Sequence, residues 1–228
     1  MSKSAEFDVV VVGAGAAGIG AGRALADSGC RFTIVEARDR VGGRAWTVDS
    51  GAGYAIDLGC EWLHSAPRNP LVPAARDLGH AVDEYPHTWA HEWNTEKLGS
   101  AAYAEFRGAT GGLFEKAGAL AAAGGPDAAF GDLLAADDPW RPAIDAICGW
   151  ITGGRLDQLS AVDMGRMDDL EVNWRLPGGY GAVIAALAEG LPLRLASPVT
   201  RIDWRGRAIT VETPDGSLTA HRVIVTLP

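Results

Sequence analysis

An apolar strand, a glycine-rich turn and a small-residue helix follow one another near the start of the chain. The strand is expected at Phe7–Val12, the turn at Gly13–Gly18 has the pattern GxGxxG, and the helix is expected over Ala17–Ser28. A second strand, Arg31–Glu36, follows and ends in an acid. This order, with the acid close to the usual spacing of about 20 residues, is typical of a βαβ unit that binds dinucleotides. The chain is therefore expected to be an α/β protein with a Rossmann-like domain.

Each part of this unit has a separate task in holding a dinucleotide. Gly13 makes the tight turn, Gly15 lets the backbone approach a pyrophosphate, and Gly18 allows close helix–strand contact. The helix N-terminus offers N–H groups and a positive dipole end to phosphates, while Glu36 can accept hydrogen bonds from a ribose diol. The candidate residues of the loop are Gly13, Ala14, Gly15, Ala16, Ala17 and Gly18. The alternative is a glycine-rich βαβ unit that binds nothing.

Composition narrows the class of protein. Hydrophobic residues make up 47% of the chain and charged residues 21%, which is ordinary for a globular protein. The net charge of −9 disfavours nucleic acid as a partner. Three scattered cysteines, Cys30, Cys60 and Cys148, indicate a reducing compartment, so we expect a cytoplasmic protein. The longest apolar stretch, Val9–Gly22, is too short to span a bilayer, and no membrane partner is expected.

A second glycine pair follows the ribose acid in the segment RVGGRAWT, residues 40–47. The run from Asp8 to Thr47 resembles the flavin-containing amine oxidases, within a wider group that includes phytoene desaturases and protoporphyrinogen oxidases. The resemblance implies FAD as the cofactor, with Gly42 and Gly43 passing close to it and Arg44 near the pyrophosphate and flavin. A guanidinium there would supply bidentate, charge-assisted hydrogen bonds. The remaining candidate cofactor contacts are Ala37 and Arg38, although Arg38 also suits a solvated charged turn.

The segment YAIDLGCEWLH, residues 54–64, is similar to the polyamine oxidase branch of this family. The resemblance implies that five residues border the isoalloxazine ring: Leu58, Gly59, Cys60, Glu61 and Trp62. His64 falls where that branch has a polar residue facing the substrate, and the alternative is an ordinary surface histidine. Glu61 could meet a substrate ammonium or point away to water. His64 and Glu61 are therefore the candidate catalytic residues, and a covalent flavin link through Cys60 is not expected.

The last part of the chain continues the same likeness. A helix over Ala182–Glu189 follows the segment LPGGYG, and strands are expected at Leu193–Trp204 and Ala208–Thr213. Two shorter strands, Leu218–Ala220 and Val223–Thr226, complete the pattern. In the family, backbone atoms at the position of Val199 hold the adenine edge, so Val199 is a further candidate by resemblance alone.

The middle of the chain is rich in alanine and glycine and predicts amphipathic helices, among them Asp132–Ala136 and Pro142–Ile151. His87 and His91 have the spacing of a helical metal pair, but no third ligand follows at a metal spacing, so no metal is expected.

We therefore expect three segments. Residues 1–66 and 171–228 form a Rossmann-like FAD-binding domain of the glutathione-reductase type, and residues 67–170 form an inserted helical substrate domain. Chains of this family are about twice as long, so the fold is expected to be incomplete at its C-terminus. A second chain could supply the missing half.

The resemblance implies an FAD-dependent amine oxidase, or a fragment or subunit of one, that uses a small-molecule amine and oxygen and forms hydrogen peroxide. One alternative is a flavoprotein like the carotenoid desaturases or protoporphyrinogen oxidases. The other is a non-catalytic FAD-binding module that needs a partner chain.

Overall fold

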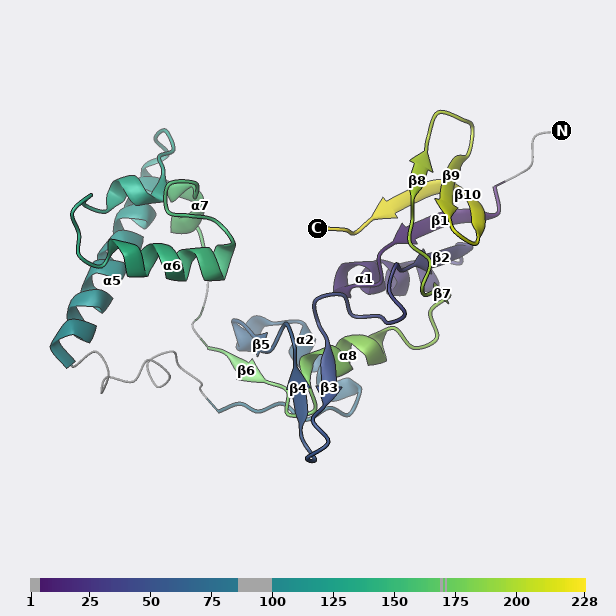
Figure 1. Cartoon of the computed structure of the whole chain (residues 1–228), viewed down its shortest axis with the longest axis horizontal. Helices are drawn as coiled ribbons and strands as arrows, with labels where there is room; N and C mark the ends of the chain where they lie inside the picture. The colour runs from purple at the N-terminus through teal and green to yellow at the C-terminus, as the bar shows by residue number, and fades with distance from the viewer. Residues whose placement is uncertain (1–4, 86–99, 169, 171) are drawn as a thin grey trace. The chain divides into compact units, whose positions relative to one another are not determined.

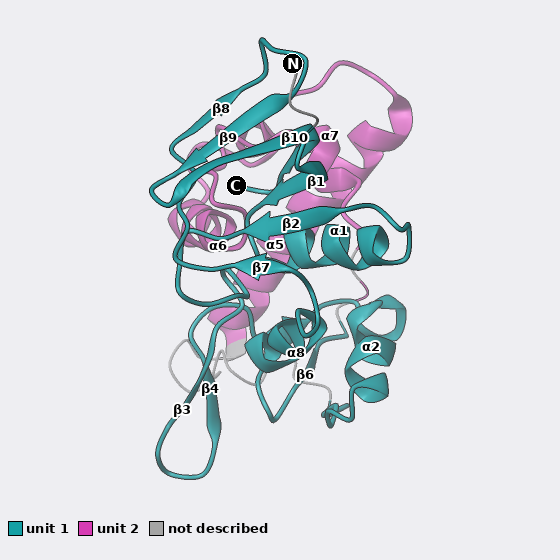
Figure 2. Cartoon of the chain, turned by 90° about the vertical axis from the view of Figure 1, so that its right-hand side faces the viewer, with its two compact units in different colours: residues 1–86, 172–228 teal, residues 87–171 magenta. Residues whose placement is uncertain are grey.

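The computed structural model describes residues 5–85, 100–168, 170 and 172–228. The chain divides into two compact units, residues 1–86 with 172–228 and residues 87–171 (Figure 2). Each is described by itself below. Within the described residues, no helix is both long and apolar enough to cross a membrane.

A six-stranded sheet forms the centre of the first unit (Figure 1). Its strand order is β7-β2-β1-β10-β9-β8. The first four of these strands run parallel, and β9 and β8 join antiparallel at one side. Their bounds are β7 Leu193–Arg194, β2 Phe32–Val35, β1 Phe7–Val12, β10 Gly216–Val225, β9 Ile209–Thr213 and β8 Arg201–Asp203.

The central strand β1 is buried on both faces, which its run of β-branched residues predicts. On one face Val9, Val11 and Ile34 pack in a cluster with Ile19 of helix α1, Ala16–Ala26, and Ile184 of helix α8, Tyr180–Leu187. The other face carries a second cluster made of the residues Val10, Val12, Val35, Val211, Leu218 and Ala220. Helices α1 and α8 therefore pack on one face of the parallel strands, and residues of β9 and β10 pack with the residues on their other face.

Three of the expected strands are wrong in their extent. The expected strand Leu193–Trp204 is broken into β7 and β8, because the chain leaves the sheet where Ala196 takes a positive φ of 49°. There Ala196 N–H donates to the carbonyl of Arg38, so this stretch follows the chain that leaves β2. The two short strands expected at residues 218–226 form one strand, β10, which pairs with β9 first and with β1 afterwards.

The first unit contains several short elements besides the six-stranded sheet and its helices. They are two antiparallel strand pairs, β3 with β4 and β5 with β6, and two short helices, η1 and α2. Their bounds are β3 Thr47–Asp49, β4 Ala55–Asp57, β5 Trp62–Leu63, β6 Trp174–Arg175, η1 Ala66–Arg68 and α2 Leu71–Asp77. Val72 and Ala75 of α2 pack with Leu176 and Val183. For this reason the first compact unit extends to residue 86, not to the expected boundary at 66.

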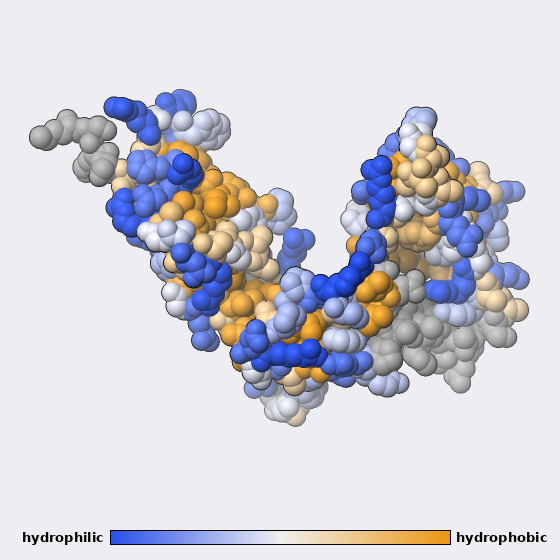
Figure 3. Space-filling model, turned by 180° about the vertical axis from the view of Figure 1, so that it is seen from behind, coloured by the Kyte–Doolittle hydropathy of each residue, from blue (hydrophilic) through white to orange (hydrophobic). Residues whose placement is uncertain are grey.

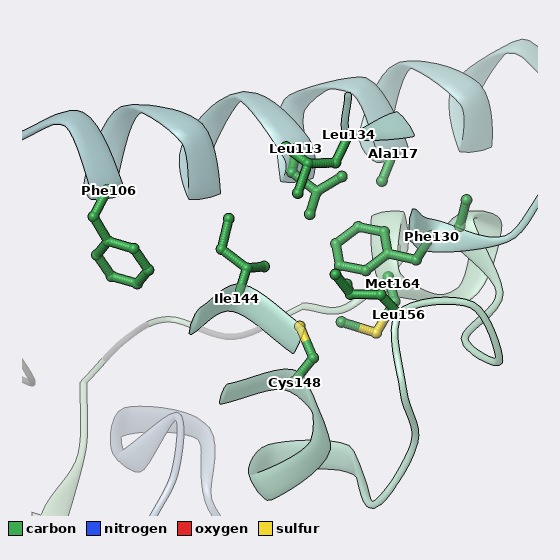
Figure 4. Packing of buried hydrophobic residues seen from close by; sticks show 10 residues of the cluster. Phe106, Leu113, Ala117, Phe130, Leu134, Ile144, Cys148, Leu156 and Met164 are labelled. Atoms are coloured by element: carbon green, nitrogen blue, oxygen red, sulfur yellow. The ribbon is translucent and has the colours of Figure 1, made fainter. Parts of the chain in front are cut away.

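The second unit is helical, with α5 Ser100–Ala123, η2 Phe130–Leu133, α6 Arg141–Thr152 and α7 Ala161–Gly165. Figure 4 shows its core, in which Phe106 and Leu113 of α5 point toward Phe130, Ile144 and Cys148. Burial raises the pKa of the Cys148 thiol, which suits a thiol that serves only in packing. The segment expected as a helix at Asp132–Ala136 is instead the single 3₁₀ turn η2, one end of which is fixed by Phe130 in this core.

Candidate functional site

The turn between β1 and α1 is held tightly by its own chain. Gly13 has a φ of +104°, and a Cβ on Gly18 would lie 1.8 Å from the carbonyl oxygen of Gly13. The hydroxyl of Thr226, just beyond β10, donates to the carbonyl of Val12 at 2.9 Å. The fold itself therefore requires glycine at positions 13 and 18, with or without a ligand.

Gly15 is different, because nothing in the described chain requires a glycine there. Its φ of −76° and ψ of −178° are extended values that any residue adopts, and the nearest atom to an added Cβ is the Cα of Gly43, 4.0 Å away. The space over Gly15 is thus free of protein. A glycine that the fold itself does not require is suited to a position where a ligand approaches the backbone closely.

Helices α1 and α8 differ in whether side chains accept hydrogen bonds from their first backbone N–H groups. Helix α1 has no side-chain cap and no acidic residue in its first turn. At α8 the carboxylate of Asp57 accepts hydrogen bonds from the N–H groups of Tyr180 and Gly181, at 2.8 and 3.3 Å, and the hydroxyl of Thr47 accepts from Ala182 N–H at 3.1 Å. Of the two glycine-rich helix starts, α1 therefore keeps its N–H groups and dipole available to an anion.

Glu36 lies at the end of β2 with its carboxylate fixed beside this loop. It is 7% exposed, and its Oε2 accepts from the N–H of Ala14 at 2.8 Å while Oε1 accepts from the N–H of Arg38 at 3.0 Å. A carboxylate has about four acceptor positions, so two remain for further hydrogen bonds. The hydrogen bond to Ala14 joins the acid to the glycine-rich turn, a link that the spacing alone did not predict.

The second glycine pair packs directly on the first loop. Gly42 N–H donates to the carbonyl of Ala14 at 2.8 Å, and a Cβ on Gly43 would lie 3.2 Å from the Cα of Gly15. Arg40 is not simply a solvated charge, because its guanidinium donates to the carbonyl of Gly43 at 3.0 Å and stacks on Trp46. Arg44, which directly follows Gly43, is exposed beside the contact between the two glycine-rich segments.

The segment that was expected to border the flavin lies against Arg44. Cys60 N–H donates to the carbonyl of Arg44 at 3.2 Å, and a Cβ on Gly59 would lie 1.9 Å from that same oxygen. Leu58 next to it leaves 54% of its surface exposed, although it is apolar. The backbone of the segment at Gly59 and Cys60 thus lies directly against the backbone of Arg44. Apolar residues remain at the surface of this unit, seen as orange areas in Figure 3.

Glu61 has a charged partner that we did not expect. Its Oε1 lies 3.1 Å from Nε of Arg175 on β6, and the guanidinium of Arg175 lies over the ring of Trp62 at 3.8 Å. A substrate ammonium and bulk water both stay predicted partners of Glu61, because the ion pair leaves 44% of its side chain exposed. A catalytic role for Glu61 stays a prediction, with its charge already balanced in part by Arg175.

His64 follows β5 and contacts a buried amide. Its Nδ1 lies 2.9 Å from Oδ1 of Asn173, which precedes β6 and is 4% exposed. Tyr180, at the start of α8, has its phenol pKa raised by burial, with Cys60 and Asp57 adding to the effect.

Val199 lies in the loop between β7 and β8. Its side chain packs against the cluster that contains Val10, Val12 and Val35. Within the described chain its backbone N–H and carbonyl make no backbone hydrogen bond, which leaves them available to a ligand edge.

Two expectations fall on residues that the structure does not describe, namely His87 and His91. Among the residues that it does describe, no group of three or more histidine, cysteine and acidic side chains could hold a metal ion.

Sequence reasoning missed Asp57, Thr47, Asn173 and Arg175. Asp57 and Thr47 cap a helix that begins over a hundred positions later, and only a structure shows that partnership. The sequence shows Asp57 before Leu58-Gly59 and the pair Gly178-Gly179 before the helix, but no sequence pattern indicates that the two segments contact each other.

Comparison with known proteins decides the family. The chain matches the family described as flavin containing amine oxidoreductase over residues 16–148 and 161–228. It belongs to this family. The expected FAD cofactor is confirmed by that membership.

The relatives include oxidases of polyamines and of other amines. Rice (Oryza sativa subsp. japonica) polyamine oxidase 4 is 30% identical over 96% of this chain and 51% of its own length. Human lysine-specific histone demethylase 2 is 24% identical over 96% of this chain and 30% of its own length. Among solved structures, a putrescine oxidase variant has a TM-score of 0.73 at 24% identity, covering 97% of this chain and 58% of that one. The chain thus spans between 30% and 58% of the length of these relatives.

Proposed function

We propose that the chain is the FAD-binding part of an amine oxidase that acts on small-molecule amines. The observation that carries this proposal is the space over Gly15, bounded by the uncapped start of α1 and by the glycine pair Gly42-Gly43. The chemistry supplied by bound FAD is acceptance of a hydride from the carbon beside the amine nitrogen, after which oxygen is reduced to hydrogen peroxide and the imine hydrolyses.

Separate groups of residues would hold separate parts of the cofactor. The N–H groups at the start of α1 would bind the pyrophosphate, and the free acceptor positions of Glu36 would bind the ribose. Backbone atoms of Val199 would meet the adenine edge. Arg44 would contact the pyrophosphate and flavin, and the stretch from Leu58 to Trp62, whose first three residues are exposed, would form one wall of the ring site.

His64 and Glu61 are the proposed substrate-facing residues. His64 would accept a hydrogen bond from a substrate amine or order a water molecule next to it. Glu61, held by Arg175, would add negative potential near a cationic substrate at a smaller desolvation cost than an unpaired carboxylate. The helical unit of residues 87–171 is proposed as the substrate domain.

Turnover is proposed to need more chain than these 228 residues. The relatives are about twice as long, and β10 has an open side: beyond Ala220 the described chain offers it no strand partner opposite β1. A strand from the rest of the protein or from a second chain would pair there. The cytoplasm is the proposed compartment, in keeping with three cysteines that are all free thiols.

The test is oxygen consumption with a panel of monoamines, diamines and polyamines. We expect the 228 residues alone to turn over no amine at a normal enzymatic rate, because catalysis needs a dry, closed pocket. Coexpression with the sequence encoded next to it should raise both FAD content and amine-dependent oxygen uptake.

Full activity from the 228 residues alone would contradict the need for further chain. A yellow protein that stays inert to every amine in both forms would contradict an amine oxidase and favour a non-catalytic FAD-binding module.

A further inference from the structure

Within the described residues, the His64 ring has a side-chain hydrogen-bond contact with Asn173, and the contacting atom of Asn173 is an acceptor oxygen. The ring is exposed, whereas Asn173 is 4% exposed and presents Oδ1 to His64 Nδ1 at 2.9 Å. An amide oxygen accepts and never donates, so the contact requires the proton on Nδ1. In the neutral ring Nε2 then carries the lone pair.

The backbone around this contact is fixed independently of it. Strands β5 and β6 pair Leu63 with Trp174, which places His64 and Asn173 at matching ends of the two strands. A second amide, Nδ2 of Asn69, donates to the carbonyl of His64 at 3.0 Å. The main chain of His64 is thus positioned by Asn69 and by the strand pair, and the ring by Asn173.

We propose that Asn173 is a positioning residue that sets the tautomer of His64, so that Nε2 is presented as the hydrogen-bond acceptor. A neutral imidazole in this form accepts at Nε2 from the N–H of an ammonium or amine, whereas a ring with its proton on Nε2 cannot accept at that atom. The consequence for an amine substrate depends on the proposed function. The tautomer itself is a property of this chain and is tested without substrate or cofactor.

The measurement is the nitrogen NMR spectrum of the chain labelled with ¹⁵N-histidine, recorded at alkaline pH, where free imidazole is neutral. The chain has 5 histidines, and the His64→Gln variant identifies the signals of His64. We expect Nδ1 to carry the proton. A wild-type ring protonated mainly on Nε2 would overturn the proposal.

Three variants separate positioning of the ring from general structure. Asn173→Leu removes the acceptor at similar volume and should shift the population toward the Nε2–H tautomer, while Asn173→Asp keeps an acceptor and should restore Nδ1–H. Asn69→Ala is the matched control, because it removes a hydrogen bond to the backbone of His64 and should leave the tautomer unchanged. An unchanged tautomer in Asn173→Leu, or an equal shift in Asn69→Ala, would contradict the assignment. If Asn173→Leu does not fold, the wild-type tautomer and Asn173→Asp still decide the matter.

Discussion

Replacing Gly15 by alanine should abolish most FAD binding while leaving the fold intact. The new methyl group meets no atom of the described chain closer than 4.0 Å, and the backbone angles suit alanine. It would occupy the place of the pyrophosphate, which would lose about two charge-assisted hydrogen bonds of about 1.5–3 kcal/mol each. We therefore expect the FAD dissociation constant to rise about 100-fold or more. The free energy of unfolding should fall by about 1 kcal/mol at most, through a poorer N-cap.

Gly18→Ala is the matched control, since it adds the same methyl group in the same loop. Its Cβ would lie 1.8 Å from the carbonyl oxygen of Gly13, so the backbone itself must move. We expect a loss of about 3 kcal/mol or more in unfolding free energy, as for other overpacked sites. Flavin fluorescence titration and urea unfolding measure both quantities for both variants. Unchanged FAD affinity in Gly15→Ala would remove the pyrophosphate from this loop.

The second large effect is expected at Glu36, where a ribose contact must be separated from a structural one. Glu36→Ala loses the ribose hydrogen bonds and also leaves the N–H of Ala14 without its partner. We expect ADP affinity to fall about 10- to 100-fold, from about 1.5–3 kcal/mol. A double-mutant cycle with the 2′-deoxy analogue of ADP separates the two causes.

In this cycle the wild-type chain should bind the 2′-deoxy analogue more weakly than ADP, and Glu36→Ala should bind the two nearly equally. If both proteins discriminate between the ligands by the same factor, the ribose does not contact Glu36, and the residue acts only through the loop.

Local patterns predicted the first βαβ unit because its parts are close in sequence. Strand β1, the turn and Glu36 form one βαβ unit whose geometry follows from glycine positions and residue spacing. The positions that the sequence could not place are those set by distant partners. Asp57 caps α8, Asn173 meets His64, and Arg175 pairs with Glu61, and each partnership crosses more than a hundred residues.

Two errors in the expected strands have the same kind of cause. Alternating residues at 193–204 indicated one strand, but Ala196 turns the chain so that it follows the segment after β2. The division of β10 into two expected strands is the second error. Its two halves pair with different neighbours, β9 and β1, while the strand itself continues. The sequence pattern indicates which residues are apolar. It does not indicate which strands pair with them, because strand pairing is set by the tertiary fold.

The most direct test of the central claim is a competition titration on the purified 228-residue chain. The account predicts that FAD binds, that ADP competes with it because both occupy the loop at Gly13–Gly18, and that NAD competes more weakly than FAD. Any flavin released by denaturing the protein should be FAD. Tighter binding of NAD than of FAD, or FAD binding that ADP does not displace, would contradict the assignment of this loop to the ADP half of a flavin cofactor.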